Sequence, residues 1–271
     1  MTLDYSTDPV RTRPTRGAYH RRTIAVAEPG IVRAAVEDEA HHFRVTLHHD
    51  GKTVTAAEGR AVRFPWDSCS GALAKLDHFV GEEISLRRGS QIEARTHCTH
   101  QYDLARFAIA QAARFEAGLP GTRQYDLRLL DRVHTNFRAE IRCDHRLVMH
   151  WEMDGAAIIG PLPYAGMDTR KRLDWGVPSP DPDLVEAALM LRRGLMIARS
   201  RDHDNVQFRL GWGPDLSPRE EGHAPGVCHT YSDEFIDSAR TRNSWVDFSW
   251  DANLLLADFP GVRKLPADLA T

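Results

Sequence analysis

The stretch HFRVTLHHDGKTVTAAEGRAVRF, residues 42–64, decides the fold of this chain. Phe43, Val45 and Leu47 alternate with polar neighbours, which is the period of a strand that buries one face. Asp50 and Gly51 form a dipeptide that closes tight hairpins. We therefore expect two antiparallel strands joined by a turn at this dipeptide.

Further strand-like sequence lies on both sides of this hairpin. TIAVA (23–27) and GIVRAAVED (30–38) precede it, and a second meander follows in QYDLRLLDRV (124–133) and NFRAEIRCDHRLVMHWEMDGAAIIG (136–160). FRVTLHHDGKTVTAAEG can be aligned with FRAEIRCDHRLVMHWEMDG, starting at the two Phe-Arg pairs. The match is compatible with a weak internal duplication and equally with two unrelated hairpins.

Three segments have helical spacing. Residues 69–81 end at a glycine, residues 100–117 repeat apolar side chains at i, i+3 and i+4, and residues 182–200 follow a capping Asp181. The motifs GxGxxG and GxxxxGK[ST] are absent, so a dinucleotide-binding fold and a P-loop are disfavoured. The sequence predicts an α+β fold, in which antiparallel sheet meanders carry helices packed on one face.

The chain divides into three parts by composition. We expect residues 1–18 to form a flexible basic arm. We expect residues 19–200 to form a single α+β domain. Residues 201–271 hold large aromatic side chains without a regular period. We expect this extension to be loop-rich and to pack on the body or on a partner subunit, so a homodimer is one expected form.

Charge and cysteine usage limit the classes of partner. The formal net charge is −3, so nothing predicts a nucleic-acid partner. No apolar run approaches the roughly 20 residues that span a bilayer, so no membrane partner is expected. The four cysteines are widely separated, which is typical of free thiols in the cytoplasm rather than of a disulfide framework.

The stretch RTHCTHQYDLARFAIAQAARF, residues 95–115, brings three chemically active groups to the start of a helix. With Thr99 as the cap, His100 lies on the core-facing side, close to His97 and Cys98 along the chain. The helix dipole disfavours an imidazolium there, so His100 would be neutral and able to act as a base. A buried, hydrogen-bonded histidine that only fixes the helix is the alternative interpretation.

The same groups could instead hold a metal. Cys69 also falls in the first turn of a helix, and two such helix ends could face each other. Cys69, Cys98 and His97 would then offer thiolate and imidazole ligands to Zn or Fe. Because 29 residues separate the two cysteines, no short-range pair specifies this site, and two half-buried thiols are the simpler interpretation.

Aromatic and basic side chains suggest a pocket for an organic substrate. Trp66, Trp151 and Tyr164 offer rings, and Arg142 and Arg170 offer guanidinium groups. This combination suits an anionic aromatic substrate. A tryptophan on an alternating strand is more often a plain core residue.

The chain resembles a bacterial family described as domain of unknown function 2889. The similarity lies in YHRRTI at residue 19, in the C…AL..L..FVG pattern of residues 69–81, in CTHQYDLA (98–105) and, more weakly, in IRCDHRLVMHWEMDG and EAALMLRRGL. It covers about residues 19–200. Ser70 replaces a common proline and Gln101 a common apolar residue, and Cys98-Thr99-His100 is intact.

The resemblance implies an activity by association, because such proteins occur with the catabolism of lignin-derived aromatics. Cofactor-independent lyases in that setting release formaldehyde from phenylpropanoid dimers. We expect His100 to be the base, Tyr102 or Tyr164 the acid and Arg142 the anion-binding group. Trp66 and Trp151 would form walls, and Arg170 would bind substrate.

Two alternatives remain open. The order of Cys-bearing helix starts is similar to iron–sulfur scaffold proteins of the NifU type, which implies a carrier that binds Zn or Fe. This chain lacks the three cysteines and the aspartate at their usual spacing. The second alternative is a small-molecule binding module without catalytic activity.

Overall fold

The protein is described by a computed structural model that covers residues 17–86, 92–131, 135–171, 179–198, 216–242 and 244–270. The arm predicted for residues 1–18 therefore lies almost wholly outside the described residues. The same holds for residues 199–215, where the predicted extension begins.

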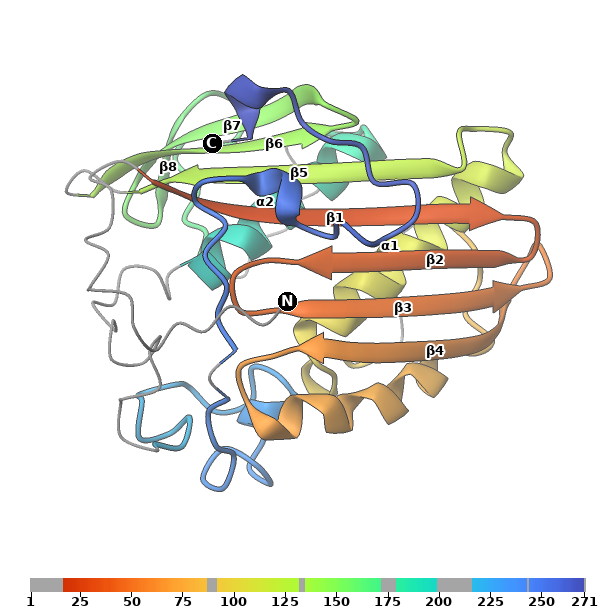
Figure 1. The fold of residues 1–271 in the computed structure, drawn as a ribbon, viewed down its shortest axis with the longest axis horizontal. Coiled ribbons are helices and arrows are strands. Elements are labelled where there is room, and N and C mark those ends of the chain that lie inside the picture. The colour runs from red at the N-terminus through yellow and green to blue at the C-terminus, as the bar shows by residue number, and fades with distance from the viewer. Residues whose placement is uncertain are drawn as a thin grey trace.

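An antiparallel sheet of eight strands forms the body, in the order β4-β3-β2-β1-β5-β6-β7-β8 (Figure 1). The predicted hairpin of residues 42–64 is present, and Asp50 accepts hydrogen bonds from the backbone of Lys52 and Thr53 at its turn. The predicted α+β class is confirmed. The strands are β1 (Ala18–Glu28), β2 (Ile31–Glu37), β3 (His42–His49), β4 (Val54–Arg63), β5 (Thr122–Leu130), β6 (Asn136–Cys143), β7 (Arg146–Asp154) and β8 (Ala157–Gly160).

The sheet consists of two similar halves that meet where β1 pairs with β5. Each half is a meander of four strands followed by a long helix, and the strand order mirrors itself about this junction. In this topology β3 and β4 correspond to β7 and β8. The alignment expected from the sequence instead places residues 43–59, in β3 and β4, on residues 137–155, in β6 and β7. It is therefore displaced by one strand, because neighbouring hairpins share the same pattern of alternation.

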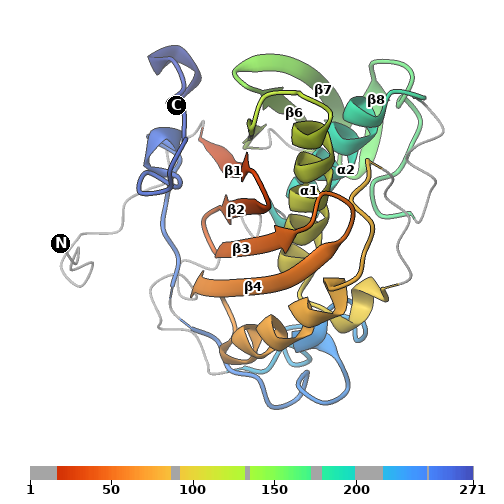
Figure 2. The same ribbon diagram turned by 90° about the vertical axis from the view of Figure 1, so that its right-hand side faces the viewer.

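The helices α1 (Thr99–Glu116) and α2 (Pro182–Ala198) cover one face of the sheet (Figure 2). Helix α1 packs on β1, β2 and β3, and α2 packs on β5, β6 and β7. The predicted cap of α2 is present, since Asp181 accepts from the backbone of Asp183. Shorter 3-10 helices are η1 (Asp67–Phe79), η2 (Ala94–Thr96), η4 (His229–Tyr231), η5 (Ala252–Leu254) and η6 (Ala267–Leu269).

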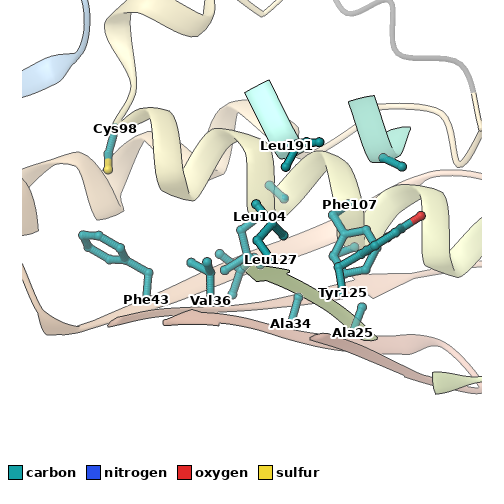
Figure 3. Close-up of a cluster of buried hydrophobic side chains, with 14 of the residues drawn as sticks. Ala25, Ala34, Val36, Phe43, Cys98, Leu104, Phe107, Tyr125, Leu127 and Leu191 are labelled. Atoms are coloured by element: carbon teal, nitrogen blue, oxygen red, sulfur yellow. The ribbon is translucent and has the colours of Figure 1, made fainter. Parts of the chain in front are cut away.

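The start of α1 differs by one residue from the prediction. Cys98, not Thr99, is the N-cap, because its carbonyl already accepts the first helical hydrogen bond from Tyr102 at 2.9 Å. Leu104 and Phe107 of α1 point toward the sheet, where Val36, Leu127 and Tyr125 meet them (Figure 3). Burial of such side chains stabilises the fold by roughly 1.5–3 kcal/mol each, which fixes α1 against the sheet.

The opposite face of the sheet is covered by residues 244–270 (Figure 2). Arg22 on β1 donates to the carbonyl of Leu255 at 3.0 Å, and the backbone of Leu256 donates to Glu37 at 2.5 Å. Phe259 is buried there with Ile24. The described part of the C-terminal extension thus packs on the body of its own chain. Within the described residues, no helix has the length and apolar character needed to cross a membrane.

Candidate functional site

A cavity of about 200 Å³ lies between α1, α2 and the centre of the sheet. The strands β1, β2 and β5 form its floor, and the two helices form its walls. Its apolar lining comes from both helices and the sheet, so an organic group can lie inside. The lining residues are Arg21, Thr23, Val36, His100, Tyr102, Asp103, Leu104, Arg106, Phe107, Leu127, Leu189, Met190, Arg192 and Arg193.

The charged part of this lining is mainly cationic. Among the described residues it contains four guanidinium groups and one carboxylate, that of Asp103. Arg193 donates to Asp103 at 2.6 Å, and Arg106 donates to Glu82 at 2.9 Å. Arg192 is held by the carbonyl oxygen of Thr169 at 2.9 Å. The cavity therefore favours a ligand with an apolar body and a negative charge.

His100 is the titratable group of the cavity wall that is best placed for proton transfer. The side chain is 7% exposed, and within the described residues its Nε2 has no hydrogen-bond partner. The sulfur of Cys98 lies 3.9 Å from Nδ1. When Nδ1–H donates to this sulfur, Nε2 carries the free lone pair and can accept a proton.

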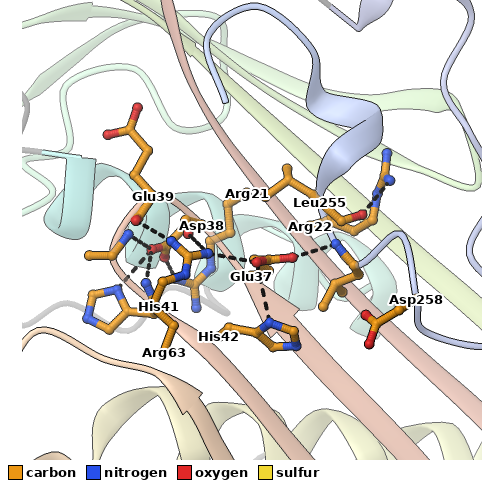
Figure 4. A network of polar contacts seen from close by, with 12 residues as sticks. Arg21, Arg22, Glu37, Asp38, Glu39, His41, His42, Arg63, Leu255 and Asp258 are labelled. Atoms are coloured by element: carbon orange, nitrogen blue, oxygen red, sulfur yellow. Dashed lines mark hydrogen bonds and ion pairs between the residues drawn. The ribbon is translucent and has the colours of Figure 1, made fainter. Parts of the chain in front are cut away.

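Asp38 lies in a buried polar network with Arg21, which lines the cavity (Figure 4). Its Oδ2 accepts from Tyr19 at 2.9 Å and from Arg21 at 2.5 Å, and its Oδ1 faces His41 Nδ1 at 2.9 Å. The backbone N–H groups of Ala40 and His41 also donate to Oδ1. Although burial opposes its charge, His41 and Arg21 hold the pKa of this carboxyl well below its usual range.

His41 connects this carboxylate to His100. The two imidazole rings stack with centroids 3.8 Å apart and planes inclined by 22°. Burial, together with the nearby His41 and Arg21, holds the pKa of His100 well below its usual range, and Asp38 opposes this effect. His100 is therefore neutral at pH 7, which is the form that a general base requires.

Asp38, His41 and His100 also form the group of candidate metal ligands in the described residues, with ligand atoms within 4.8 Å of one another. Both oxygens of Asp38 already accept hydrogen bonds from side chains and backbone. In addition, the two rings lie face to face, whereas imidazoles that share an ion point their nitrogen atoms at it. This arrangement fits a carboxylate that holds His41 in a stack on His100 better than it fits an ion site.

The metal ligands expected from the sequence do not form such a group. In the described residues, ligand atoms of Cys69, Cys98 and His97 do not come within 4.8 Å of one another as a set. Cys69 contacts the hydroxyl of Thr230, at 3.4 Å, while His97 contacts His78, at 3.3 Å. Burial raises the pKa of Cys69 to about 11 and also raises that of Cys98, so both are neutral thiols.

His97 has a different environment from His100. It is fully buried, and burial together with His78 and Lys75 lowers its pKa to about 4. Its carbonyl accepts from the backbone of His229 at 2.9 Å. This histidine therefore joins the 3-10 helix η1 to the segment around residue 229, outside the lining of the cavity.

The remaining predicted site residues are distributed over the molecule. Tyr102 contributes to the lining of the cavity, and its ring packs on those of Phe79 and His97, with centroids 5.5 and 5.7 Å away. Tyr164 packs on the ring of Trp151 with centroids 5.3 Å apart, and neither lines the cavity. Trp66 packs against Tyr231. These aromatic side chains fill the core beneath loops and strands, so they do not form walls around His100.

The two predicted guanidinium groups also lie away from the cavity. Arg142 pairs with Glu140 on the sheet face that residues 244–270 cover, opposite the helices. Register explains this, because Arg142 is paired with Asp126, whose side chain binds Arg22 on that face. Arg170 is exposed and pairs with Asp168.

Sequence reasoning missed the residues that complete the site: Arg21, Asp38, His41, Arg192 and Arg193. Arg21 lies within YHRRTI and the two helical arginines within EAALMLRRGL, two of the blocks that carry the family resemblance. Asp38 and His41 lie in the turn between β2 and β3, and the packing of α1 on these strands brings His100 beside them.

Comparison of the chain with protein-family models finds no match, and comparison with curated proteins finds none either. The resemblance described from the sequence blocks therefore stays a prediction.

Proposed function

We propose that the protein is a cofactor-independent lyase that acts on a small phenolic compound and releases formaldehyde from it. The observation that carries the proposal is His100, a buried neutral imidazole in the wall of a cavity lined by apolar side chains and guanidinium groups. Its Nε2 has no hydrogen-bond partner in the part of the chain that the structure describes. The choice of formaldehyde comes from the family resemblance.

The substrate has a phenol ring, a benzylic carbon with a leaving group, and a neighbouring carbon that bears a primary alcohol. Loss of the phenolic proton and of the leaving group gives a quinone methide, and Tyr102 protonates the departing oxygen. Tyr102 is the acid in this scheme because it lines the cavity, whereas Tyr164 does not. Each positioned proton-transfer group contributes on the order of 10²–10⁴-fold in rate.

The base then completes the reaction. His100 Nε2 takes the proton of the primary alcohol, the bond between the CH2OH carbon and the carbon that bears it breaks, and the CH2OH carbon leaves as formaldehyde. The electron pair of that bond forms the double bond to the benzylic carbon and restores the aromatic ring as a phenolate, beside the guanidinium of Arg21. After proton return, the products are formaldehyde, the protonated leaving group and a phenol with a new carbon–carbon double bond, so atoms and electrons balance.

The size of the cavity limits the substrate. A cavity of roughly 150 Å³ accommodates benzene, so one of about 200 Å³ holds one substituted ring. The second ring of a phenylpropanoid dimer would extend beyond it. We place the reaction in the cytoplasm, since the four cysteines are free thiols.

The test is an assay of formaldehyde release. The protein is incubated with phenols that carry the primary alcohol and the leaving group, and with the same compounds methylated at the phenolic oxygen. We expect formaldehyde from the free phenols only, because the methyl ether cannot form a quinone methide. Equal release from both series, or none from either, would contradict the proposal.

A further inference from the structure

The guanidinium groups of the cavity exceed what a single phenolate oxygen needs. Four of them line it, from β1, α1 and α2, and they face six apolar side chains. Because Arg142 lies on the other face of the sheet, the anion-binding group expected from the sequence must be sought among these four. The contacts of Arg192 and Arg193, both on α2, indicate which of the four binds the anion.

Arg193 is oriented but retains free donors. Among the described residues, its Nε donates to Asp103 at 2.6 Å, and this is its one hydrogen bond. A guanidinium has five N–H groups in a planar fork, so both terminal nitrogens of Arg193 are available. The side chain is 22% exposed, which leaves it accessible from the cavity.

Arg192 lies next to it and is held from behind. Its Nε donates to the carbonyl of Thr169 at 2.9 Å, and a second contact reaches the carbonyl of Lys171 at 3.4 Å. These carbonyl oxygens orient the guanidinium of Arg192. Burial is the main cause that lowers the pKa of Arg192; repulsion from the adjacent Arg193 adds to it, and Asp103 opposes it. A bound anion would relieve that repulsion.

We infer that the substrate carries a carboxylate, and that Arg192 and Arg193 bind it at the α2 wall of the cavity. That this ligand is the substrate of a lyase rests on the proposed function; that the cavity binds a carboxylate does not. A carboxylate matches the planar guanidinium fork with two parallel hydrogen bonds. A dianion fits less well, because Asp103 already places one negative charge on Arg193 and repels a phosphate more strongly than a carboxylate.

The test compares ligands that differ only in charge. Binding of hydroxyphenylpropanoate, of hydroxyphenylpropanamide and of phenyl phosphate to the full-length protein is measured by isothermal titration calorimetry. We expect the carboxylate to bind at least about tenfold more tightly than the amide, since charge-assisted hydrogen bonds exceed neutral ones. Equal binding of acid and amide, or tightest binding of the phosphate, would overturn the inference.

Three variants locate the effect. Arg193→Gln should reduce the preference for acid over amide at least about tenfold. Asp103→Asn should strengthen binding of the carboxylate, because it removes a repulsive charge from the cavity; weaker binding would contradict the assignment. Arg170→Gln is the matched control, since Arg170 is exposed and pairs with Asp168 outside the cavity, and it should leave the preference unchanged.

The two proposals fail separately. Selective binding of the carboxylate without any release of formaldehyde would remove the lyase reaction and keep the carboxylate site. Release of formaldehyde from neutral phenols and from phenolic acids at equal kcat/KM would keep the reaction and remove the carboxylate site.

Discussion

The imidazole ring of His41 lies on that of His100, with 3.8 Å between their centroids, and its Nδ1 faces Asp38 Oδ1 at 2.9 Å. The stack fixes the orientation of the His100 ring. Burial and the nearby His41 and Arg21 disfavour the doubly protonated, charged form of this ring. The charged and titratable groups near His100 are Arg21 on β1, Asp38 and His41 in the turn after β2, Cys98 before α1 and Arg193 on α2.

Replacement of His41 should shift the acidic limb of the pH–rate profile. In His41→Phe a ring still stacks on His100, but one cause of its depressed pKa is gone, so the pKa rises. Activity that needs neutral His100 is lost as pH falls through that pKa, so the loss moves to higher pH. Histidine-selective NMR titration measures the same shift without a substrate. His48→Phe, on β3 away from the cavity, is the control, and an unmoved His100 titration in His41→Phe would contradict the assignment.

Asp38 should contribute stability that depends on pH. Its pKa in the folded protein is well below the unfolded value, so the contribution is present above about pH 4 and is lost as pH falls further. Asp38→Asn breaks a buried network and should cost about 3–5 kcal/mol at pH 7, with a smaller difference near pH 3. Urea unfolding across this pH range measures it. The exposed Asp258→Asn should cost less than about 1 kcal/mol.

The cysteines should behave as buried thiols rather than as metal ligands. Burial raises the pKa of Cys69 to about 11 and raises that of Cys98, so alkylation of both in the native protein at pH 8 should be slow. All four cysteines should react after denaturation, and a chelator should leave Tm unchanged. About one Zn or Fe per chain, lost together with Tm on chelation, would instead support the carrier alternative.

The C-terminal segment should stabilise the sheet that carries the site. Phe259 is buried against Ile24 and Ala35 on the face opposite the helices. Phe259→Ala should therefore cost about 3 kcal/mol of unfolding free energy. Leu254→Ala in the same segment should change it by less than about 0.5 kcal/mol, because Leu254 is 57% exposed. Equal effects of the two variants in urea unfolding would show that the segment does not hold the sheet.

Local patterns in the sequence were sufficient to predict the strands and the main helices. Alternation around Phe43 and the spacing around Leu104 report directly on burial, and the turn at Asp50 follows from backbone chemistry. The pairing of strands is not local, so the displaced alignment of the two halves could not be detected from hairpin composition. Only the position of β1 against β5 shows which strands correspond.

The sequence predicted only part of the candidate site, because only contacts between residues close along the chain can be inferred from local patterns. His100 and Tyr102 lie two positions apart, so their common place in the first turn of α1 follows from the sequence. Asp38 and Arg21 meet His100 because α1 packs on β1, β2 and β3, which no short motif records. Arg142 was predicted to belong to the site and lies outside it. A shift of one residue along β6 would have turned it toward the helices, but the register places it on the other face of the sheet.

The most direct test of the central claim is the kcat/KM for formaldehyde release by His100→Gln, measured beside its Tm. Glutamine keeps a polar group in the cavity wall but cannot accept the proton. We predict a loss of at least about 10²-fold in kcat/KM with a nearly unchanged Tm. Full activity in the variant, or a fall in Tm that parallels the loss of activity, would contradict the assignment of His100 as the base.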